Sequence, residues 1–227
     1  MISPKQILCF LFLSCSISLT AQQDEVGNWI MYFGQNRVSD QFSIHTEIQY
    51  RDYTFAPINI NTEQLLLRTG LNYHFSSSAF ATAGYAYIGS YEYGSDQKSP
   101  EVNEHRIWQQ LIMNDRIGRV KFEHRYRIEQ RWVNGDYRNR FRYRLMIFLP
   151  LNRPSIEPGA VFLGLYDEIF INTEAVFFDR NRLYGALGYQ FSKSTQVQLG
   201  LLHQRVNDFG KYYVQMGLVF NPDFRSN

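Results

Sequence analysis

The side chains with the most evident chemistry are the arginines between residues 119 and 144, where charged and apolar residues alternate position by position. The charged positions are Arg119, Lys121, Glu123, Arg125, Arg127, Glu129 and Arg131, followed after the turn at 134–136 by Arg138, Arg140, Arg142 and Arg144. A guanidinium group offers paired N–H donors that match a carboxylate or a phosphate. A surplus of such groups in a narrow, low-dielectric space creates a strong positive field. The pattern therefore predicts attraction of anions, for passage or for binding.

Carboxylates on other segments lead to a second interpretation. Glu47, Glu104 and Glu168 stand on the polar faces of their own alternating segments, and Glu123 and Glu129 stand among the arginines. Burying many charges without partners is costly. If the alternating segments are strands of a narrow barrel, as argued below, its interior is commonly filled by its own side chains. We therefore favour an internal ion-pair network over an anion path, and both interpretations stay open at this point.

One pair of residues predicts a different chemistry. His74 and Ser76 stand two positions apart, a spacing that resembles the base and nucleophile of outer-membrane lipid hydrolases. In such an enzyme the histidine takes the proton of the serine hydroxyl, and a third group orients the histidine. No orienting group stands at a recognisable spacing, so the hydrolase is the alternative hypothesis and an enzyme is the less favoured class. The other histidines lack metal-ligand spacing and no glycine-rich phosphate loop occurs, so we expect no metal and no cofactor.

Alternation of polar and apolar residues also identifies the elements that must position these side chains. Successive side chains on a strand point to opposite faces, whereas the same residues would scatter around a helix. Such segments lie near 26–34, 41–53, 64–75, 79–91, 102–116, 119–132, 137–149, 158–171, 181–191, 195–206 and 211–220. One polar and one apolar face per strand suits a polar lumen and a lipid-facing wall. The sequence therefore predicts an all-β protein, a single antiparallel transmembrane up-and-down β-barrel of about 10–12 strands.

The number of segments is itself a difficulty for that prediction. Eleven segments are found, whereas single-chain bacterial barrels normally have an even number of strands. Either 26–34 lies outside the wall, which leaves about ten strands, or two strands have been merged into one, which gives about twelve.

The N-terminal residues predict export. Lys5 precedes a short apolar run and Ala21 stands before a polar stretch, which is the pattern of a cleaved secretory signal peptide over 1–21. Residues 22–227 would then form one barrel domain in the outer membrane of a Gram-negative cell, with membrane lipid as its partner.

Composition agrees with an exported barrel. Both cysteines, Cys9 and Cys15, lie in the predicted leader, so no disulfide or thiolate chemistry is expected. A net charge of +2 gives no general reason to bind nucleic acid. Aromatic residues make up 16% of the chain and the mean hydropathy is −0.34, which suits strands that are apolar only at alternate positions.

Motifs along the chain resemble a known family. They are Trp29; Glu47 to Arg51; Arg125, Arg127, Glu129, Gln130 and Arg131; Arg138 to Arg144; Glu168; and Asn181-Arg182-Leu183-Tyr184 followed by Gly188-Tyr189. In this order they are similar to the domain of unknown function 2490, a group of exported outer-membrane β-barrel proteins. The resemblance runs from about Trp29 to Phe220. It implies a fold and a location but no activity, so no catalytic residue carries over.

These observations lead to one favoured function and two others. The favoured one is a non-enzymatic outer-membrane barrel with an arginine-rich, ion-paired lumen, either structural or handling small anionic solutes. The alternative is an outer-membrane lipid hydrolase that uses His74 and Ser76. The third is a soluble secreted β-protein whose aromatic faces pair against another sheet. The oligomeric state is not predicted.

Overall fold

The computed structural model describes residues 26–55, 61–94, 96, 98–173 and 177–225. The strands are β1 (Gly27–Arg37), β2 (Phe42–Asp52), β3 (Thr62–His74), β4 (Ala79–Ser90), β5 (Val102–Ile117), β6 (Val120–Val133), β7 (Asp136–Pro150), β8 (Val161–Asn172), β9 (Phe178–Gln190), β10 (Thr195–Val206) and β11 (Phe209–Phe220). No helix in these described ranges is long and apolar enough to cross a membrane. The predicted signal peptide, with Cys9 and Cys15, lies outside the described residues.

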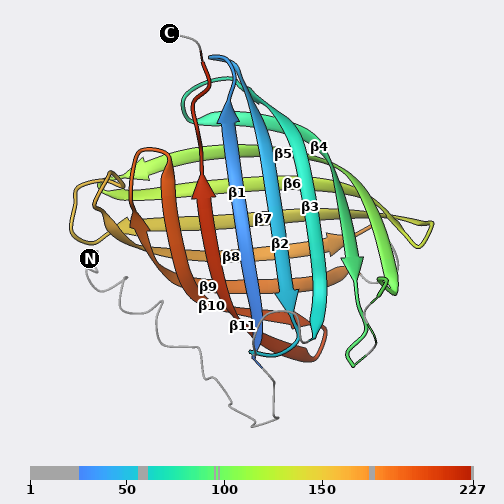
Figure 1. Ribbon diagram of the computed structural model, residues 1–227. Helices are drawn as coiled ribbons and strands as arrows, with labels where there is room; N and C mark the ends of the chain where they lie inside the picture. The colour runs from blue at the N-terminus through green and yellow to red at the C-terminus, as the bar shows by residue number, and fades with distance from the viewer. Residues whose placement is uncertain (1–25, 56–60, 95, 97, 174–176, 226–227) are drawn as a thin grey trace, which may run out of the picture.

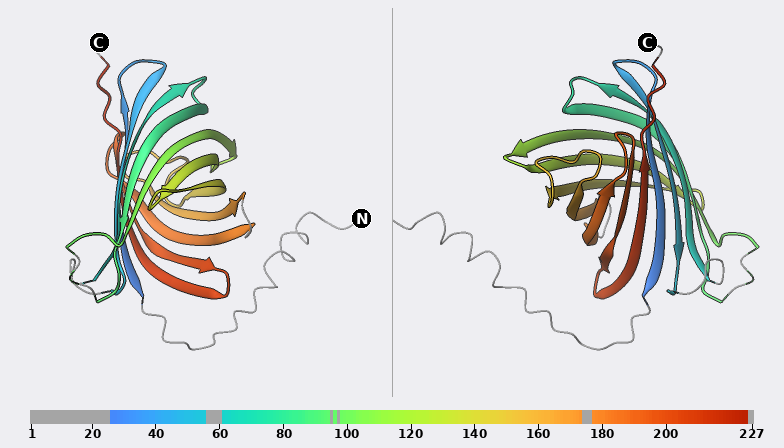
Figure 2. Two further views of the ribbon diagram at one scale, coloured as in Figure 1. Left: turned by 90° about the vertical axis from the view of Figure 1, so that its right-hand side faces the viewer. Right: turned by 60° about the vertical axis from the view of Figure 1, so that its left-hand side comes forward.

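The strands close into a barrel in which each strand pairs with its neighbours in sequence and β1 pairs with β11 (Figures 1 and 2). This confirms the predicted all-β barrel. The expectation of an even strand number is wrong: the barrel has eleven strands, and the segment predicted at 26–34 belongs to the wall as β1. A ring of only antiparallel pairs needs an even number because strand directions alternate. Here β1 and β11 run parallel, so an odd number closes.

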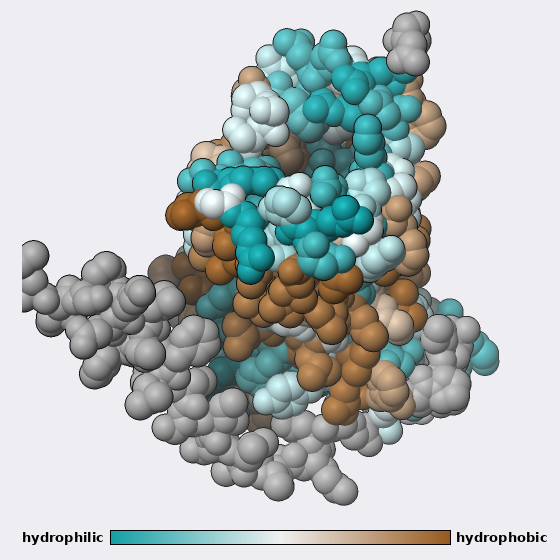
Figure 3. Space-filling model, turned by 90° about the vertical axis from the view of Figure 1, so that its left-hand side faces the viewer, coloured by the Kyte–Doolittle hydropathy of each residue, from teal (hydrophilic) through white to brown (hydrophobic). Residues whose placement is uncertain are grey.

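Alternation along each strand separates an inner from an outer face. On β2, Glu47 points inward and its side chain is 2% exposed, whereas its neighbour Ile48 is 49% exposed on the outer face. The outer face carries large apolar side chains on every part of the wall, among them Leu71, Ile107, Leu165, Leu187 and Leu199. Figure 3 shows on one side of the molecule a hydrophobic band beneath a hydrophilic region.

The two ends of the barrel carry different connections. We call the end where β1 begins the N-terminal end; it carries the connections 53–61, 91–101, 134–135, 173–177 and 207–208. The opposite, C-terminal end carries 38–41, 75–78, 118–119, 151–160 and 191–194, and the chain leaves β11 there. The hairpin between β6 and β7 turns on Asn134 and Gly135, whose φ angles are +48° and +97°. Two-residue hairpins of this kind need positive φ at both central positions, which asparagine and glycine tolerate.

Apolar side chains pack in two groups on the inner face. The larger group comes from β1 and β7–β11 and consists of Trp29, Met31, Met146, Tyr166, Tyr184, Ala186, Leu202 and Tyr213. The smaller group lies on β3–β5 and consists of Leu66, Ala86, Ile88 and Trp108. The charged side chains beside these groups therefore lie in a partly apolar environment.

Candidate functional site

The hairpin β6–β7 places most of the predicted charge cluster in the lumen. The register sets Arg125 opposite Arg144 and Arg127 opposite Arg142. Like charges directly opposite each other on one face destabilise a sheet pair. The hairpin therefore depends on carboxylates that other positions supply.

Two members of the predicted cluster do not join the others. Arg119 lies exposed in the turn between β5 and β6. Arg138 lies near the N-terminal end with its side chain 50% exposed, 3.9 Å from Asp136. These two positions are the outer limits of the hairpin's charged face, so they reach solvent at either mouth of the barrel.

Glu129 is the centre of the largest group of ion pairs. Its side chain is fully buried. Arg140 donates from Nε and Nη2 to one carboxylate oxygen at 3.0 and 2.6 Å, and Arg142 donates from Nη1 to the other at 2.7 Å. Arg68, Arg106 and Arg127 approach the same carboxylate at 3.7–3.8 Å. One carboxylate thus faces five guanidinium groups, so its charge is shared among them.

Glu168 on β8 compensates the other side of the hairpin. Its Oε1 accepts from Nη2 of Arg125 at 2.6 Å and from Nε and Nη2 of Arg142 at 2.9 and 2.7 Å. Arg125 belongs to β6, which does not pair with β8. The glutamate therefore reaches across the inner face of β7 and joins three strands.

The remaining predicted glutamates pair nearer to their own strands. Glu47 accepts from Arg68 at 2.8 Å and lies 3.0 Å from His45. Glu104 accepts from Arg106 and Arg131, each at 2.5 Å at the closest. Glu123 accepts from Arg144 at 2.5 Å. All of these side chains are buried or half-buried, so the charges meet inside the barrel.

The predicted cluster omitted several charged residues that share this space. Arg51, Arg68 and Arg106 stand on the inner faces of β2, β3 and β5 and follow the same alternation, so the pattern in the sequence contained them. The prediction also missed two further groups. One consists of Arg180 and Arg182 on β9 with Asp179, and the other consists of Glu63 with Arg51 and Lys211. Glu63 and Lys211 are distant in the chain and meet only because the barrel closes.

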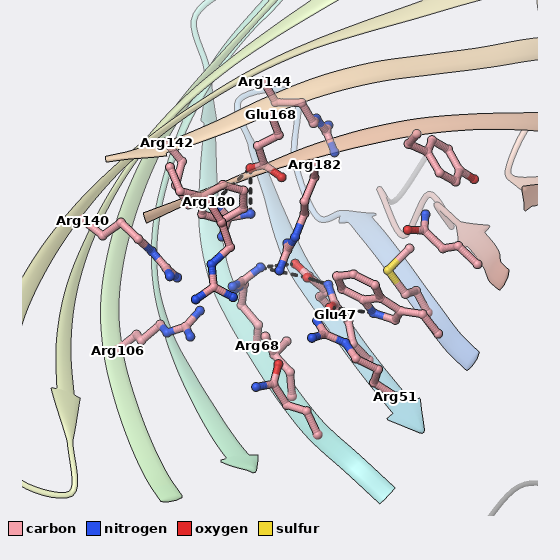
Figure 4. A pocket seen from close by; sticks show the side chains of 18 of the residues that line it. Glu47, Arg51, Arg68, Arg106, Arg140, Arg142, Arg144, Glu168, Arg180 and Arg182 are labelled. Carbon is pink, nitrogen blue, oxygen red and sulfur yellow. Dashed lines mark hydrogen bonds and ion pairs between the residues drawn. The ribbon is translucent and has the colours of Figure 1, made fainter. Parts of the chain in front are cut away.

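A cavity of about 310 Å³ lies among these groups, lined by ten arginines and three glutamates. In Figure 4 Arg140, Arg142, Arg180 and Arg182 reach into it from β7 and β9, and Arg68 and Arg106 reach in from the facing strands. The carboxylates that lie behind the lining are Glu63, Glu123, Glu129 and Asp179. The arginines still outnumber all these carboxylates, so the cavity has a net positive lining.

Arg182 shows this surplus most clearly. Its Nε donates to Oε1 of Gln204 at 2.8 Å, and its guanidinium lies 4.7 Å from the ring centre of Trp29 and 4.6 Å from that of Phe170. No carboxylate forms an ion pair with it among the residues that the structure describes. In addition, the buried Nε–H groups of Arg68 and Arg125 donate no hydrogen bond within the described part of the chain. These two Nε–H groups are shielded from the cavity, whereas the guanidinium of Arg182 lines it, so Arg182 is the group among these three that an anion can reach.

Two further cavities continue from this one toward the C-terminal end. A second, of about 420 Å³, shares Phe33, Glu47, Arg125 and Arg144 with the first. A third, of about 770 Å³ at the C-terminal mouth, shares Lys121 and Phe148 with the second and is also lined by Arg116, Arg119 and Lys193. The interior is therefore hollow in part rather than filled throughout, and we call the side chains that the first two cavities share the constriction.

The structure does not join His74 to Ser76. Nε2 of His74 lies 2.8 Å from Oγ of Ser43 on the neighbouring strand. Oγ of Ser76 accepts from the backbone N–H groups of Ser78 and Ala79 and so closes the turn between β3 and β4. Ser43 is fully buried and also accepts from Nδ2 of Asn72 at 2.8 Å. The histidine is thus paired with a buried serine, and the exposed Ser76 has no contact with it among the hydrogen bonds of the described residues.

Titratable groups beyond the strands are held by local contacts. At the C-terminal end, hydrogen bonds from the side chain of Arg225 lower the pKa of Asp223 to about 2. At the N-terminal end, burial raises the pKa of Tyr53, whose hydroxyl donates to the backbone carbonyl of Tyr91. No group of three or more His, Cys, Asp or Glu side chains suited to a metal ion occurs within the described ranges.

Comparison with known proteins gives one match. A family model described as "Protein of unknown function (DUF2490)" matches residues 26–215. No curated protein and no solved structure matches the chain.

Proposed function

The chain belongs to the family of proteins of unknown function DUF2490, and from this premise we propose that it is an outer-membrane β-barrel whose arginine-lined lumen binds small anionic solutes without catalysing a reaction. The family assignment agrees with the resemblance found in the sequence. The activity has to come from the site, because a fold does not determine a function.

The outer face of the barrel supports a place in a membrane. Large apolar side chains such as Leu71, Leu187 and Leu199 are 52–56% exposed on the wall. Water would disfavour a continuous apolar surface of this size, whereas lipid chains favour it. A closed barrel also leaves no unpaired strand edge. A β-structure that spans a membrane must have no such edge, because lipid cannot satisfy the exposed backbone groups. Density-gradient fractionation of cells, with a heat-dependent shift of the folded protein on gels, tests this location.

The lining of the cavity carries the proposal for anions. Ten arginines face three glutamates around about 310 Å³. Buried charges without counter-charges are unstable, so this lining favours occupation by an anion. The planar N–H edges of guanidinium groups fit phosphate and carboxylate oxygens. A small oxyanion with more than one negative charge matches this site best.

The ion pairs have a supporting role in this function. Glu129 and Glu168 hold Arg140, Arg142 and Arg125 in fixed orientations. Fixed donors lose less conformational freedom when a ligand binds. The ion-pair network that we favoured from the sequence is therefore compatible with the anion site. It holds arginines of the cavity in place, and the arginines of the lining still outnumber its glutamates.

Titration of the purified protein with inorganic pyrophosphate in a non-ionic detergent tests the proposal by calorimetry. We expect binding that weakens as salt concentration rises. Arg182→Gln removes an arginine that forms no ion pair with any carboxylate of the described residues. It should weaken binding about tenfold, since a charge-assisted hydrogen bond contributes roughly 1.5–3 kcal/mol. Arg138→Gln, at the exposed end of β7, is the matched control and should bind as the unchanged protein does. Absence of pyrophosphate binding by the unchanged protein would refute the proposal.

A further inference from the structure

The junction of β1 and β11 is the weakest part of the barrel wall. It pairs seven residues, Gly27–Phe33 with Tyr213–Val219, and it is the parallel junction. Each antiparallel junction pairs ten residues or more, as between β1 and β2. Parallel pairing is slightly less stable per residue than antiparallel pairing. We call this junction the seam, and we expect it to separate more readily than the other junctions.

An apolar groove of about 510 Å³ lies on the outer wall over the seam and the strands beside it. Its apolar lining comes from β1 and from β8–β11, and includes Ile30, Leu187, Val197, Leu199, Met216 and Leu218. Most of these side chains point outward. In a membrane this groove would lie against lipid chains.

The groove and the arginine-lined cavity are separated by very little protein. Met31 and Gln198 contribute to both. Gly217 is paired with Met31 on one side and with Gln198 on the other, so it stands between them. A Cβ atom at Gly217 would meet only Cβ of Gln198, at 4.0 Å. Close packing therefore does not demand a glycine there, and its effect is to reduce the wall to backbone thickness.

Positive charge lies directly behind the seam. The inner side of β1 carries Trp29, whose ring has the guanidinium of Arg51 at 3.7 Å and that of Arg182 at 4.7 Å. Glu63 neutralises Arg51 at 3.0 Å, whereas Arg182 has no ion-pair partner in the described part of the chain. Of these two arginines behind the seam, Arg182 is therefore the one whose charge is available to an anionic group.

We propose that the ligand of this lumen is an anionic lipid of the surrounding membrane, whose acyl chain lies in the outer groove and whose phosphate reaches Arg182 through the seam. This inference rests on the proposed anion-binding function and names the ligand class. The apolar groove and the basic cavity meet at Met31 and Gln198, and an amphiphile is the molecule whose two parts match these two surfaces. A soluble anion uses the cavity but has no use for the groove.

A disulfide across the seam tests the route. The test uses the chain without the predicted leader 1–21, which contains both cysteines of the sequence, Cys9 and Cys15. A pair introduced at Ile30→Cys and Met216→Cys, which face each other across the seam, then has no other cysteine in the chain to react with. The matched control is Ile48→Cys with Leu67→Cys, a facing pair on the outer side of β2 and β3. Each protein is placed in nanodiscs of phosphatidylcholine with a minor share of phosphatidic acid. Native mass spectrometry then counts the phosphatidic acid retained on the protein, before and after reduction of the disulfide.

The proposal predicts a specific set of results. The unchanged protein and the β2–β3 control should retain phosphatidic acid in preference to phosphatidylcholine. The oxidised seam pair should retain about tenfold less, and reduction should restore it. Gly217→Leu, which thickens the wall without a clash at Cβ, should lower retention in the same way. In all of these proteins pyrophosphate binding should persist, because its entry does not use the seam.

Other outcomes distinguish the proposed lipid ligand from the anion-binding function on which it rests. If pyrophosphate binds but phosphatidic acid is not retained above phosphatidylcholine, the lipid ligand is refuted and the anion site stands. If the locked seam retains phosphatidic acid as the reduced form does, the route through the seam is refuted. If neither ligand binds, both proposals fall. Heat-dependent migration of each variant on gels shows that it has folded.

Discussion

Neutralising Glu129 should destabilise the barrel more than any change to an exposed carboxylate. Glu129→Gln keeps the size of the side chain and removes the charge that Arg140 and Arg142 contact at 2.6 and 2.7 Å. Arg68, Arg106 and Arg127 lie at 3.7–3.8 Å from the same carboxylate. The substitution therefore leaves five buried guanidinium groups facing a neutral amide.

The magnitude follows from burial and distance. At an effective dielectric constant of about 20, unit charges roughly 4 Å apart attract by about 4 kcal/mol. Part of this attraction offsets the desolvation of the charges, and the loss of one partner from a buried pair typically costs about 3–5 kcal/mol. Arg142 keeps Glu168 as a partner at 2.7 Å, which places the expected loss in unfolding free energy near the lower value, about 3 kcal/mol.

Urea titration in detergent micelles, followed by tryptophan fluorescence, measures this loss. Trp108 is paired with Glu129 across β5 and β6 and reports on the site. Glu157→Gln, in the exposed connection between β7 and β8, is the matched control and should change stability by less than about 0.5 kcal/mol. Adding Arg142→Gln to Glu129→Gln should cost less than the sum of the two single changes, because the ion pair between these two residues is already lost in each single variant. A loss below about 1 kcal/mol for Glu129→Gln would refute the view that this network holds the interior together.

Three further predictions concern the wall, the constriction and the turn. Leu199→Arg places a charge on the outer face and should reduce folding stability in lipid vesicles by about 2–4 kcal/mol if the position lies near the bilayer centre; equal urea midpoints for both proteins would contradict a lipid-facing wall. Phe33→Ala removes a ring from the constriction that the first two cavities share, so anion-selective conductance in planar bilayers should rise, and an unchanged current would contradict the proposed connection between cavities. Ser76→Ala should leave lipid hydrolysis assays unchanged, since His74 pairs with Ser43; loss of a measurable activity would restore the hydrolase hypothesis.

The strand pattern allowed the two faces of the wall to be predicted because the side-chain period of a strand is two. Glu47 and Ile48 could be assigned to opposite faces from their positions alone, and the structure buries one and exposes the other. The same alternation places Arg68 and Arg106 on the inner face, although they were left out of the predicted cluster. It failed at the ends of the hairpin, where Arg119 and Arg138 keep the alternation but reach solvent.

The number of strands was misjudged because a general preference was given more weight than the pattern. Eleven segments were visible, and a preference for even numbers argued against one of them. That preference assumes antiparallel closure. The parallel pairing of β1 with β11 joins residues at the two ends of the barrel sequence. The local sequence of either strand does not indicate the direction of this pairing.

The sequence by itself determined the strands, their inner and outer faces and the excess of arginine in the interior, because alternation is a local property of the chain. Only the tertiary structure decided which charges meet. Glu168 bonds Arg125 across an intervening strand, and Glu63 meets Lys211 only where the barrel closes. These contacts depend on strand order, register and curvature, which together set where each inner side chain points. For the same reason the seam, the groove over it and the position of Arg182 behind it, away from the carboxylates of the described residues, appear only when the sheet is closed.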